Sequence, residues 1–353
     1  MTFYDRWLRM WDESEAEKRA GRRSIHEEEL DWVETVQDHR AALLISPESG
    51  FRTMGTITML AEIPPMACSG EHKHGEETIY IISGSGFSVV DLLRYDWAPG
   101  SVIAVPFGSR HQHFNTGTTT ARYFSVLSVH LEHFAGVHRT VQYQPHGWIH
   151  DAPDFALASN GLDMQGRRIH ISEDHASTTT LANADPTPVR LDDLDGERDR
   201  QVQKLLDGET LDVGDIEGFH RLIHLHRDEG NVRQIMRVGR DVNGFSVAEH
   251  EISGVLRDPG GCYSGKHAHQ EALLYVLAGS GHSVIDDEIV PWKPGTAIYI
   301  PGPQTVHQHF VNSADDSRMI RVSSGLRYFF EPILKTEWPY LFMAPRQGIV
   351  ESR

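Results

Sequence analysis

The chain contains an internal repeat, and this repeat constrains its fold more than any other feature. Residues 69–106 and 264–301 align without a gap at a shift of 195, and 17 of the 38 aligned positions are identical. Further on, "HQHFN" at 111–115 faces "HQHFV" at 307–311 after one inserted residue. A repeat of this kind indicates a duplicated structural unit, so the chain is expected to hold two similar units in tandem.

Both copies lie within stretches of strand-like sequence. From about residue 51 to 145, and again from about 218 to 328, short runs of β-branched and aromatic residues are broken by Gly, Pro, Asn and Asp. This texture is typical of short strands joined by turns. The sequence therefore predicts an all-β protein built from two units.

The regions outside the two units have a different character. Helical spacing of Trp7, Met10 and Trp11 predicts an N-terminal helix, and "RRSIHEEELDWVET" predicts a second helix with Ser24 as its N-cap. A short helix is expected at 196–208. The predicted organisation is an N-terminal helical arm (1–50), a first β unit (51–148), a linker or crossing segment (149–215), a second β unit (216–330) and a C-terminal tail (331–353).

Composition and charge exclude several classes of protein. The net charge of −17 disfavours nucleic acid as a partner, because phosphate binding needs clustered Lys and Arg. No apolar run is long enough for a transmembrane helix, and the charged N-terminus is unlike a signal peptide. The two cysteines, Cys68 and Cys262, lie in separate units and form no disulfide framework. We therefore expect a cytoplasmic protein with neither nucleic acid nor membrane as a partner.

The histidines point to a metal site. His72 and His74 in "HKH" are two residues apart, so on a strand their rings lie on the same face. A third histidine, His111, opens a later predicted strand after the turn at Gly108. Imidazole suits iron, copper, nickel and zinc, and a carboxylate adds preference for harder ions.

These residues carry a resemblance to a known family. The pattern G-x5-P-x-G-x2-H-x3-N is matched at each defined position, by Gly100, Pro106, Gly108, His111 and Asn115. Together with His72, His74 and Gly84, this resembles the cupin superfamily, and the two copies resemble a bicupin over roughly residues 55–135 and 250–328. The resemblance implies two jelly-roll (double-stranded β-helix) barrels behind the helical arm. It also implies a metal held by His72, His74, His111 and a glutamate.

Two glutamates compete for the place of the fourth ligand. Counting back from Gly84, the family's Glu-x6-Gly spacing selects Glu77, and strand alternation places Glu77 on the face of Ile79. The internal repeat instead preserves Glu76, which faces Glu271 in the second copy. We favour Glu77, although a strand bulge at Gly75 would reverse the choice.

The second copy departs from the family pattern. It keeps His267, His269 and His307, but Ala272 stands where the family's glutamate is expected. In "PGPQTVH", Gly302 is out of place and one residue is added. A three-histidine metal site is expected there. The alternative is a degenerate copy whose histidines only form hydrogen bonds inside the barrel.

The chain further resembles the gentisate, salicylate and hydroxynaphthoate ring-cleaving dioxygenases. They share the bicupin layout, the helical arm, a histidine two residues after the third ligand, here His113, and tolerance of a missing motif glutamate. The resemblance implies an iron(II) dioxygenase that cleaves a hydroxylated aromatic acid. His113 would hydrogen-bond substrate or serve as acid or base, and Arg110 would pair with a substrate carboxylate. In those enzymes the active first cupin lacks the glutamate, whereas this one has two.

Two other functions remain open at this point. A manganese bicupin that decarboxylates a small carboxylic acid, or a flavonol-type dioxygenase, fits four protein ligands that include Glu77. A small-molecule-binding cupin without catalysis is the third reading, because cupins host many chemistries. The bicupin resemblance also implies a homo-oligomer, either a dimer or a tetramer.

Overall fold

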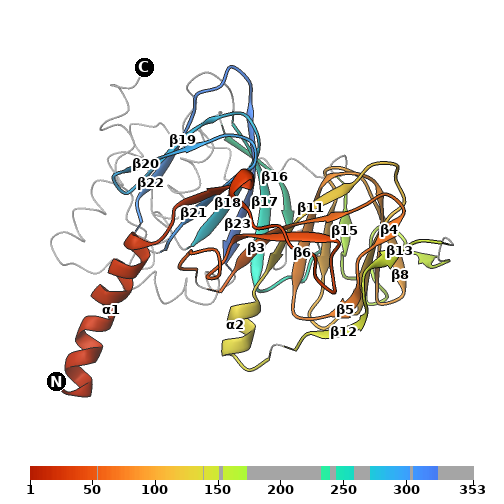
Figure 1. Ribbon diagram of the computed structural model, residues 1–353, viewed down its shortest axis with the longest axis horizontal. Helices are drawn as coiled ribbons and strands as arrows, with labels where there is room; N and C mark the ends of the chain where they lie inside the picture. The colour runs from red at the N-terminus through yellow and green to blue at the C-terminus, as the bar shows by residue number, and fades with distance from the viewer. Residues whose placement is uncertain are drawn as a thin grey trace, which may run out of the picture.

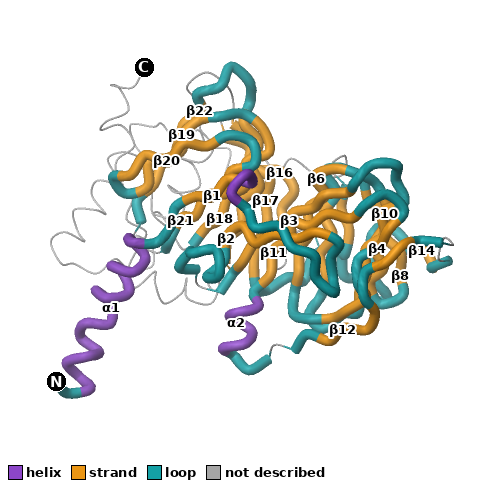
Figure 2. The backbone as a smooth tube through the Cα atoms, in the orientation of Figure 1, coloured by secondary structure: helices purple, strands orange, loops and turns teal. Residues whose placement is uncertain are grey.

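Two β assemblies lie side by side, and an N-terminal helix projects away from them (Figure 1). The computed structural model describes residues 1–172 apart from 54, 138 and 151–153, together with 232–238, 244–257, 271–302 and 305–324. In these ranges the α-helices are α1 (Phe3–Ala20) and α2 (Val129–Phe134), and Figure 2 shows strands throughout the rest of the core. No described helix has the length and apolar character needed to cross a membrane. The predicted all-β class is confirmed.

Two sheets build the first barrel. The first sheet has the order β15 (His170–Ile171), β9 (Val102–Val105), β6 (Glu77–Ser83), β11 (Ala121–Leu127), β3 (Ile57–Ile63) and β2 (Arg40–Ile45). The second has the order β12 (Val141–Gln144), β5 (Glu71–Lys73), β10 (His111–Asn115), β7 (Gly86–Val90), β8 (Leu93–Trp97) and β14 (Ala156–Leu157). Two short strands extend it, with β4 (Ala67–Cys68) paired to β10 and β13 (Gly147–Trp148) paired to β4. The sheets of the first barrel thus include strands that lie before residue 51 and after residue 148 in the sequence.

The second barrel repeats this plan. Its larger sheet has the order β1 (Ser24–His26), β21 (Thr296–Ile300), β18 (Ala272–Ala278), β23 (Ser317–Ser324), β17 (His250–Arg257) and β16 (Val232–Val238). Its smaller sheet has the order β20 (Glu288–Trp292), β19 (Gly281–Ile285) and β22 (His307–Val311). The repeat seen in the sequence therefore corresponds to two structural units.

The larger sheets of the two barrels pack against each other. Alternate residues of β11 serve the two faces of its sheet, because successive side chains of a strand point in opposite directions. Phe124 joins a core that spans both barrels, where its ring stacks on Tyr275 of the second barrel at 5.3 Å between centroids. Tyr123 joins the separate core inside the first barrel. The strand alternation thus builds one barrel interior and one interface between barrels.

Each barrel receives an edge strand from the segment that precedes the other barrel's repeat unit. In β1, Ser24 pairs with Ile298, and in β15, His170 pairs with Ile103. These partners are equivalent positions of the repeat, since 298 − 103 = 195. Strand β1 therefore completes a sheet of the second barrel, although it precedes the strands of the first barrel in the sequence.

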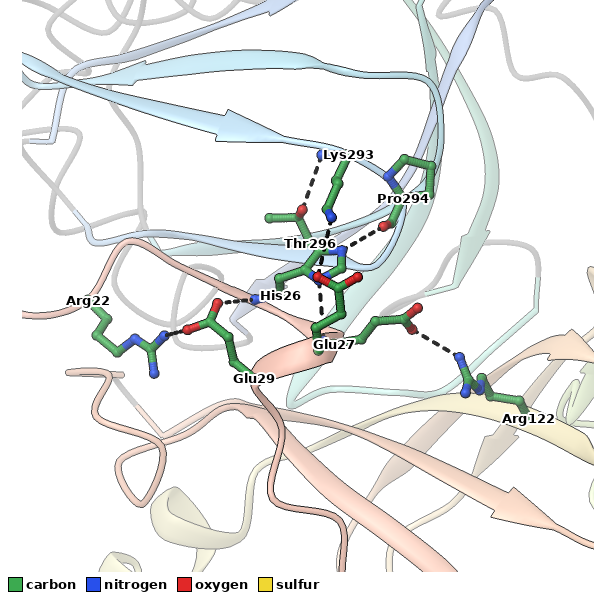
Figure 3. Close-up of polar contacts among 9 residues, drawn as sticks. Arg22, His26, Glu27, Glu29, Arg122, Lys293, Pro294 and Thr296 are labelled. Carbon is green, nitrogen blue, oxygen red and sulfur yellow. Dashed lines mark hydrogen bonds and ion pairs between the residues drawn. The ribbon is translucent and has the colours of Figure 1, made fainter.

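The turn after β1 links the two barrels (Figure 3). It is a 3-10 helix, η1 (Glu27–Glu29). The Glu27 backbone N–H donates to Gly295 of the second barrel at 3.0 Å, and the Glu27 carboxylate pairs with Arg122 of the first at 2.9 Å. Residues close to the N-terminus thus hold strands of both barrels together.

The second helix predicted from "RRSIHEEELDWVET" is not formed. Residues 24–26 are strand β1, and the side chain that caps η1 is that of His26 rather than Ser24. Ile25 is only 4% exposed in the core between the barrels, which outweighs the local helical preference of the glutamates. The helix predicted at 196–208 and the tail 331–353 lie outside the described residues.

Truncating Ile25 tests whether β1 is part of the second barrel. Ile25→Ala removes a buried side chain from the core between barrels, so we expect a loss of about 2–5 kcal/mol in the free energy of unfolding. Denaturant unfolding of the full chain measures it. Ile289→Ala is the matched control, because Ile289 is 67% exposed on β20. Equal effects of the two substitutions would contradict the placement of β1.

Candidate metal centre

Four buried side chains of the first barrel come together in its interior. Their metal-binding atoms all lie within 4.8 Å of one another, and they belong to His72, His74, Glu77 and His111. Each of the four residues is at most 7% exposed. These are the four positions predicted to hold a metal in the first copy.

The pairing of strands explains how the histidines meet. His111 opens β10 directly opposite His72 on β5, and their ring centroids are 4.2 Å apart. His74 lies two residues beyond His72, and its ring is 4.8 Å from each of the other two. The two-residue period of one strand and the register with its neighbour thus bring the three rings together.

Glu77, and not Glu76, faces these histidines. Glu77 Oε2 lies 3.4 Å from both His74 Nε2 and His111 Nε2, while its Oε1 accepts a hydrogen bond from Ser125. Glu76 points to the second barrel, where its Oε2 accepts the backbone N–H groups of Ala248 and Glu249 at 2.7 and 2.9 Å. The choice of Glu77 from the spacing to Gly84 agrees with this geometry.

A bend at Gly75 precedes the two glutamates, of which Glu76 contacts the second barrel and Glu77 faces the histidines. Residues 74–76 lie between β5 and β6 in no strand, so alternation restarts at Glu77. A Cβ added at Gly75 would lie 1.6 Å from Glu132 Oε1 of α2. A larger residue here would therefore displace the Glu132 carboxylate, which packs directly on this peptide.

Hydrogen bonds orient two of the three histidines toward the cluster. His111 Nδ1 lies 2.9 Å from the Ser109 carbonyl, and His74 Nδ1 lies 3.1 Å from the Gly75 carbonyl. A carbonyl oxygen only accepts, so each Nδ1 carries the hydrogen and each Nε2 keeps its lone pair. The two Nε2 atoms face Glu77. Metal-binding histidines are usually supported in this way, by an acceptor on the other ring nitrogen.

The charge state of the cluster also suits a cation. Burial alone would raise the pKa of Glu77, but the neighbouring rings of His111 and His74 hold it well below its usual range. Burial lowers the pKa of His72 to about 2, with His111 and His74 acting in the same direction. A carboxylate and a neutral imidazole are the forms that bind metal.

Two buried nitrogens of the cluster have no hydrogen-bond partner in the described part of the chain. They are His72 Nδ1 and His111 Nε2. Buried polar atoms in folded proteins are nearly always satisfied, so an orphaned pair at one point calls for a ligand. Three imidazoles and one carboxylate fit a divalent transition metal ion, which would satisfy such atoms.

The two residues predicted to be catalytic occupy different environments. His113 is 3% exposed inside the barrel, with its ring 5.6 Å from that of His111, and burial lowers its pKa to about 3. Arg110 is at the surface, where its guanidinium makes two hydrogen bonds of 2.6 Å to Glu71 and lies over the ring of Tyr143. His113 thus shares the interior of the cluster, whereas Arg110 already has an anionic partner.

Sequence reasoning missed three residues beside the cluster. Ser125 and Tyr123 both face the barrel interior from β11, and strand alternation alone would have suggested them. Tyr123 donates a hydrogen bond of 2.9 Å to Asp38, and burial raises the pKa of that carboxyl to about 6. No sequence signal marked Asp38, because it lies in the segment predicted as a helical arm.

The second barrel keeps part of this arrangement. His307 Nδ1 lies 3.1 Å from the Thr305 carbonyl, as His111 does from that of Ser109. Ala272 begins β18 at the place of Glu77. His267 and His269 lie outside the described residues.

A cation replaces the serine that supports Glu77. β11 pairs Leu127 with Glu77, and β23 pairs Ser323 with Ala272, so Arg321 stands where Ser125 does in the first barrel. Arg321 is 8% exposed and donates to Ser323 at 2.7 Å. The second interior therefore lacks both the Glu77 carboxylate and the serine that supports it.

Comparison with known proteins identifies the two units. Residues 59–127 and 255–323 match the family described as the cupin domain, so the chain carries two cupin domains. A 104-residue segment is 31% identical to 5-aminosalicylate 1,2-dioxygenase of Comamonas sp.. That alignment spans 29% of this chain and only 28% of the relative.

Solved structures share the fold across most of the chain. A variant of salicylate 1,2-dioxygenase from Pseudoaminobacter salicylatoxidans, in complex with gentisate, aligns with a TM-score of 0.56 over 93% of this chain and 82% of its own, at 13% identity. The coconut allergen cocosin aligns with a TM-score of 0.54 over 87% and 86%, at 11% identity. A dioxygenase and an allergen share this fold, so the fold alone does not decide the reaction.

Substituting Gly75 tests the packing beneath the cluster. Gly75→Ala forces the buried Glu132 carboxylate to move, so we expect a loss of about 1–3 kcal/mol in unfolding free energy, measured by denaturant unfolding. Gly147→Ala is the control, because an added Cβ there meets nothing within 4 Å. A Gly75→Ala protein as stable as the control would show that Glu132 does not pack as described.

Proposed function

We propose that this bicupin is a metal-dependent oxygenase that cleaves the ring of a hydroxylated aromatic acid of the salicylate or gentisate type. The observation that carries the proposal is the buried cluster of three histidines and Glu77 in a chain similar to 5-aminosalicylate 1,2-dioxygenase. Iron(II) is the metal we propose, since histidines and a carboxylate that leave coordination positions open are typical of non-haem iron oxygenases.

His72, His74, His111 and Glu77 would hold the metal. Bound iron(II) would supply redox chemistry with dioxygen and a Lewis-acid position for oxygen atoms of the substrate. Ser125 orients the carboxylate, because it occupies Oε1 and leaves Oε2 directed at His74 and His111. The backbone carbonyls at Ser109 and Gly75 hold two imidazoles in the tautomer that donates a lone pair.

The residues around the cluster suit an anionic substrate. His113 is buried and neutral beside the metal ligands, so it would hydrogen-bond an oxygen of the substrate without adding charge. Asp38 and Tyr123 form a buried hydrogen-bonded pair, and burial raises the pKa of Asp38 to about 6, so this carboxyl would exchange a proton in mildly acidic solution. Arg110 would bind a substrate carboxylate only by leaving Glu71.

The second barrel would bind metal more weakly. We propose that His267, His269 and His307 form a three-histidine site there, without the carboxylate that completes the first. The first barrel would therefore hold the catalytic metal.

A manganese decarboxylase is the second candidate. The observation that favours it is Glu77 itself, because a carboxylate adds preference for harder ions such as manganese. Its substrate would be a small carboxylic acid, and it would consume no oxygen in proportion to product.

Three further sequence-based expectations remain proposals. They are the five-part division of the chain at residues 50, 148, 215 and 330, assembly as a homo-oligomer, and a cytoplasmic location. The acidic net charge of −17 also supports a small-molecule substrate rather than nucleic acid.

Paired glutamate substitutions test the metal site. Glu77→Gln removes the anionic ligand and should lower iron(II) affinity at least about tenfold, whereas Glu76→Gln should leave it unchanged because Glu76 faces the other barrel. Metal content after dialysis against a graded chelator gives the measurement. A loss of metal in Glu76→Gln equal to that in Glu77→Gln would refute the assignment.

Oxygen consumption tests the reaction. Iron-loaded protein should take up one equivalent of dioxygen per molecule of salicylate- or gentisate-type acid consumed, and His72→Ala should abolish this uptake. His307→Ala is the control and should retain most of it, since its barrel lacks the carboxylate. Absence of uptake with every phenolic acid would remove the dioxygenase proposal, and carbon dioxide release by the manganese-loaded protein would favour the decarboxylase.

A further inference from the structure

Three buried side chains form a hydrogen-bonded chain behind the metal cluster. Ser88 of β7 lies directly across from His113 of β10, and Ser88 Oγ is 2.7 Å from His113 Nδ1. Trp97 of β8 donates its indole N–H to the same Ser88 Oγ at 3.1 Å. All three residues are at most 4% exposed, so no bulk water replaces these contacts.

Counting hydrogens determines the direction of each bond. The indole nitrogen of Trp97 is a donor only, so it uses one lone pair of Ser88 Oγ. The Ser88 hydroxyl then needs an acceptor for its own hydrogen, and His113 Nδ1 is the acceptor that the described contacts provide. If Nδ1 instead carried a hydrogen, the oxygen would receive two donors and its own hydrogen would stay unpaired.

This count places the imidazole hydrogen of His113 on Nε2. A neutral imidazole carries a single N–H, and Nδ1 is the acceptor. Nε2 is the ring nitrogen farther from the backbone, on a side chain that shares a strand face with His111. The ring also lies 5.7 Å from that of Tyr123 across the barrel interior.

We propose that Ser88 and Trp97 are positioning residues that hold His113 with its hydrogen on Nε2, so that it presents a neutral donor to an acceptor oxygen of the substrate. The proposal deepens the proposed function and rests on it. The opposite tautomer would present a lone pair to the same oxygen, which turns attraction into repulsion. The hydrogen-bonded chain of Trp97, Ser88 and His113, called the relay below, therefore selects oxygen-rich, anionic ligands for the space beside the metal.

The second barrel contains the same parts without the complete relay. Ser283 Oγ lies 2.7 Å from His309 Nδ1, and Trp292 stands at the position of Trp97. Within the described residues, however, Trp292 Nε1 has no hydrogen-bond partner. Without that donor on the serine oxygen, the hydrogen count there does not impose one direction.

Nitrogen NMR of the histidines tests the tautomer directly. The full chain is labelled with ¹⁵N-histidine and loaded with zinc(II), which is diamagnetic, and His113→Gln identifies the signals of His113. We expect the wild-type protein to show its N–H on Nε2 of His113. Trp97→Phe and Ser88→Ala should each produce a mixture of the two tautomers, while Ser283→Ala should leave the His113 signals unchanged.

Kinetics then separates positioning from support of the fold. With iron(II) and salicylate as the probe, Ser88→Ala and Trp97→Phe should lower kcat/KM for oxygen uptake at least about tenfold, with metal content unchanged. Ser283→Ala is the matched control and should stay near wild type. If Ser88→Ala fails to fold, Trp97→Phe alone carries the test, because it leaves Ser88 and His113 in place.

The two proposals fail in distinguishable ways. A wild-type His113 with its hydrogen on Nδ1, or a Trp97→Phe protein with an unchanged tautomer, would overturn the relay whatever the enzyme does. A correct tautomer with unchanged kcat/KM in both variants would overturn its positioning role. Absence of oxygen uptake by the wild type would instead reject the dioxygenase, and with it the positioning role, while the NMR result still decides the tautomer.

Discussion

The site depends on the alternation of side chains along a β-strand. His72 and His74 face one point because they are two residues apart, and His111 and His113 share a face for the same reason. On β11 the same period sends Tyr123 into the barrel interior and Phe124 into the core between barrels. One geometric rule therefore separates the residues of the candidate metal centre from those that hold the barrels together.

Much of this arrangement could be predicted from the sequence, because it follows from local spacing and from the repeat. The shift of 195 predicted two units, and the distance from Gly84 selected Glu77. The edge strand β1 could not be found in this way, since its partner on β21 lies more than 270 residues later in the chain. Asp38 was missed for the same reason, because only the folded barrel brings it to Tyr123 of β11.

The two barrels have diverged at linked positions. Glu77 and Ser125 are hydrogen-bonded in the first barrel, and Ala272 and Arg321 occupy the matching places in the second. The second barrel therefore lacks the acid and also the hydroxyl that would support it. The change at one position thus makes sense only together with the change at the other.

Glu76, the glutamate that the repeat preserves, contacts the second barrel rather than the histidine cluster. Its carboxylate accepts the backbone N–H groups of Ala248 and Glu249, which lead into the second barrel. Its counterpart Glu271 lies 2.9 Å from the Tyr299 hydroxyl. That hydroxyl also contacts the Arg52 carbonyl, in the segment that leads into the first barrel. Glu76 thus contacts the other copy directly, whereas Glu271 contacts Tyr299 of its own barrel. Because Glu76 precedes Glu77 directly, a shift of the second barrel at residues 248 and 249 would be transmitted to the histidine cluster of the first barrel through a single peptide bond.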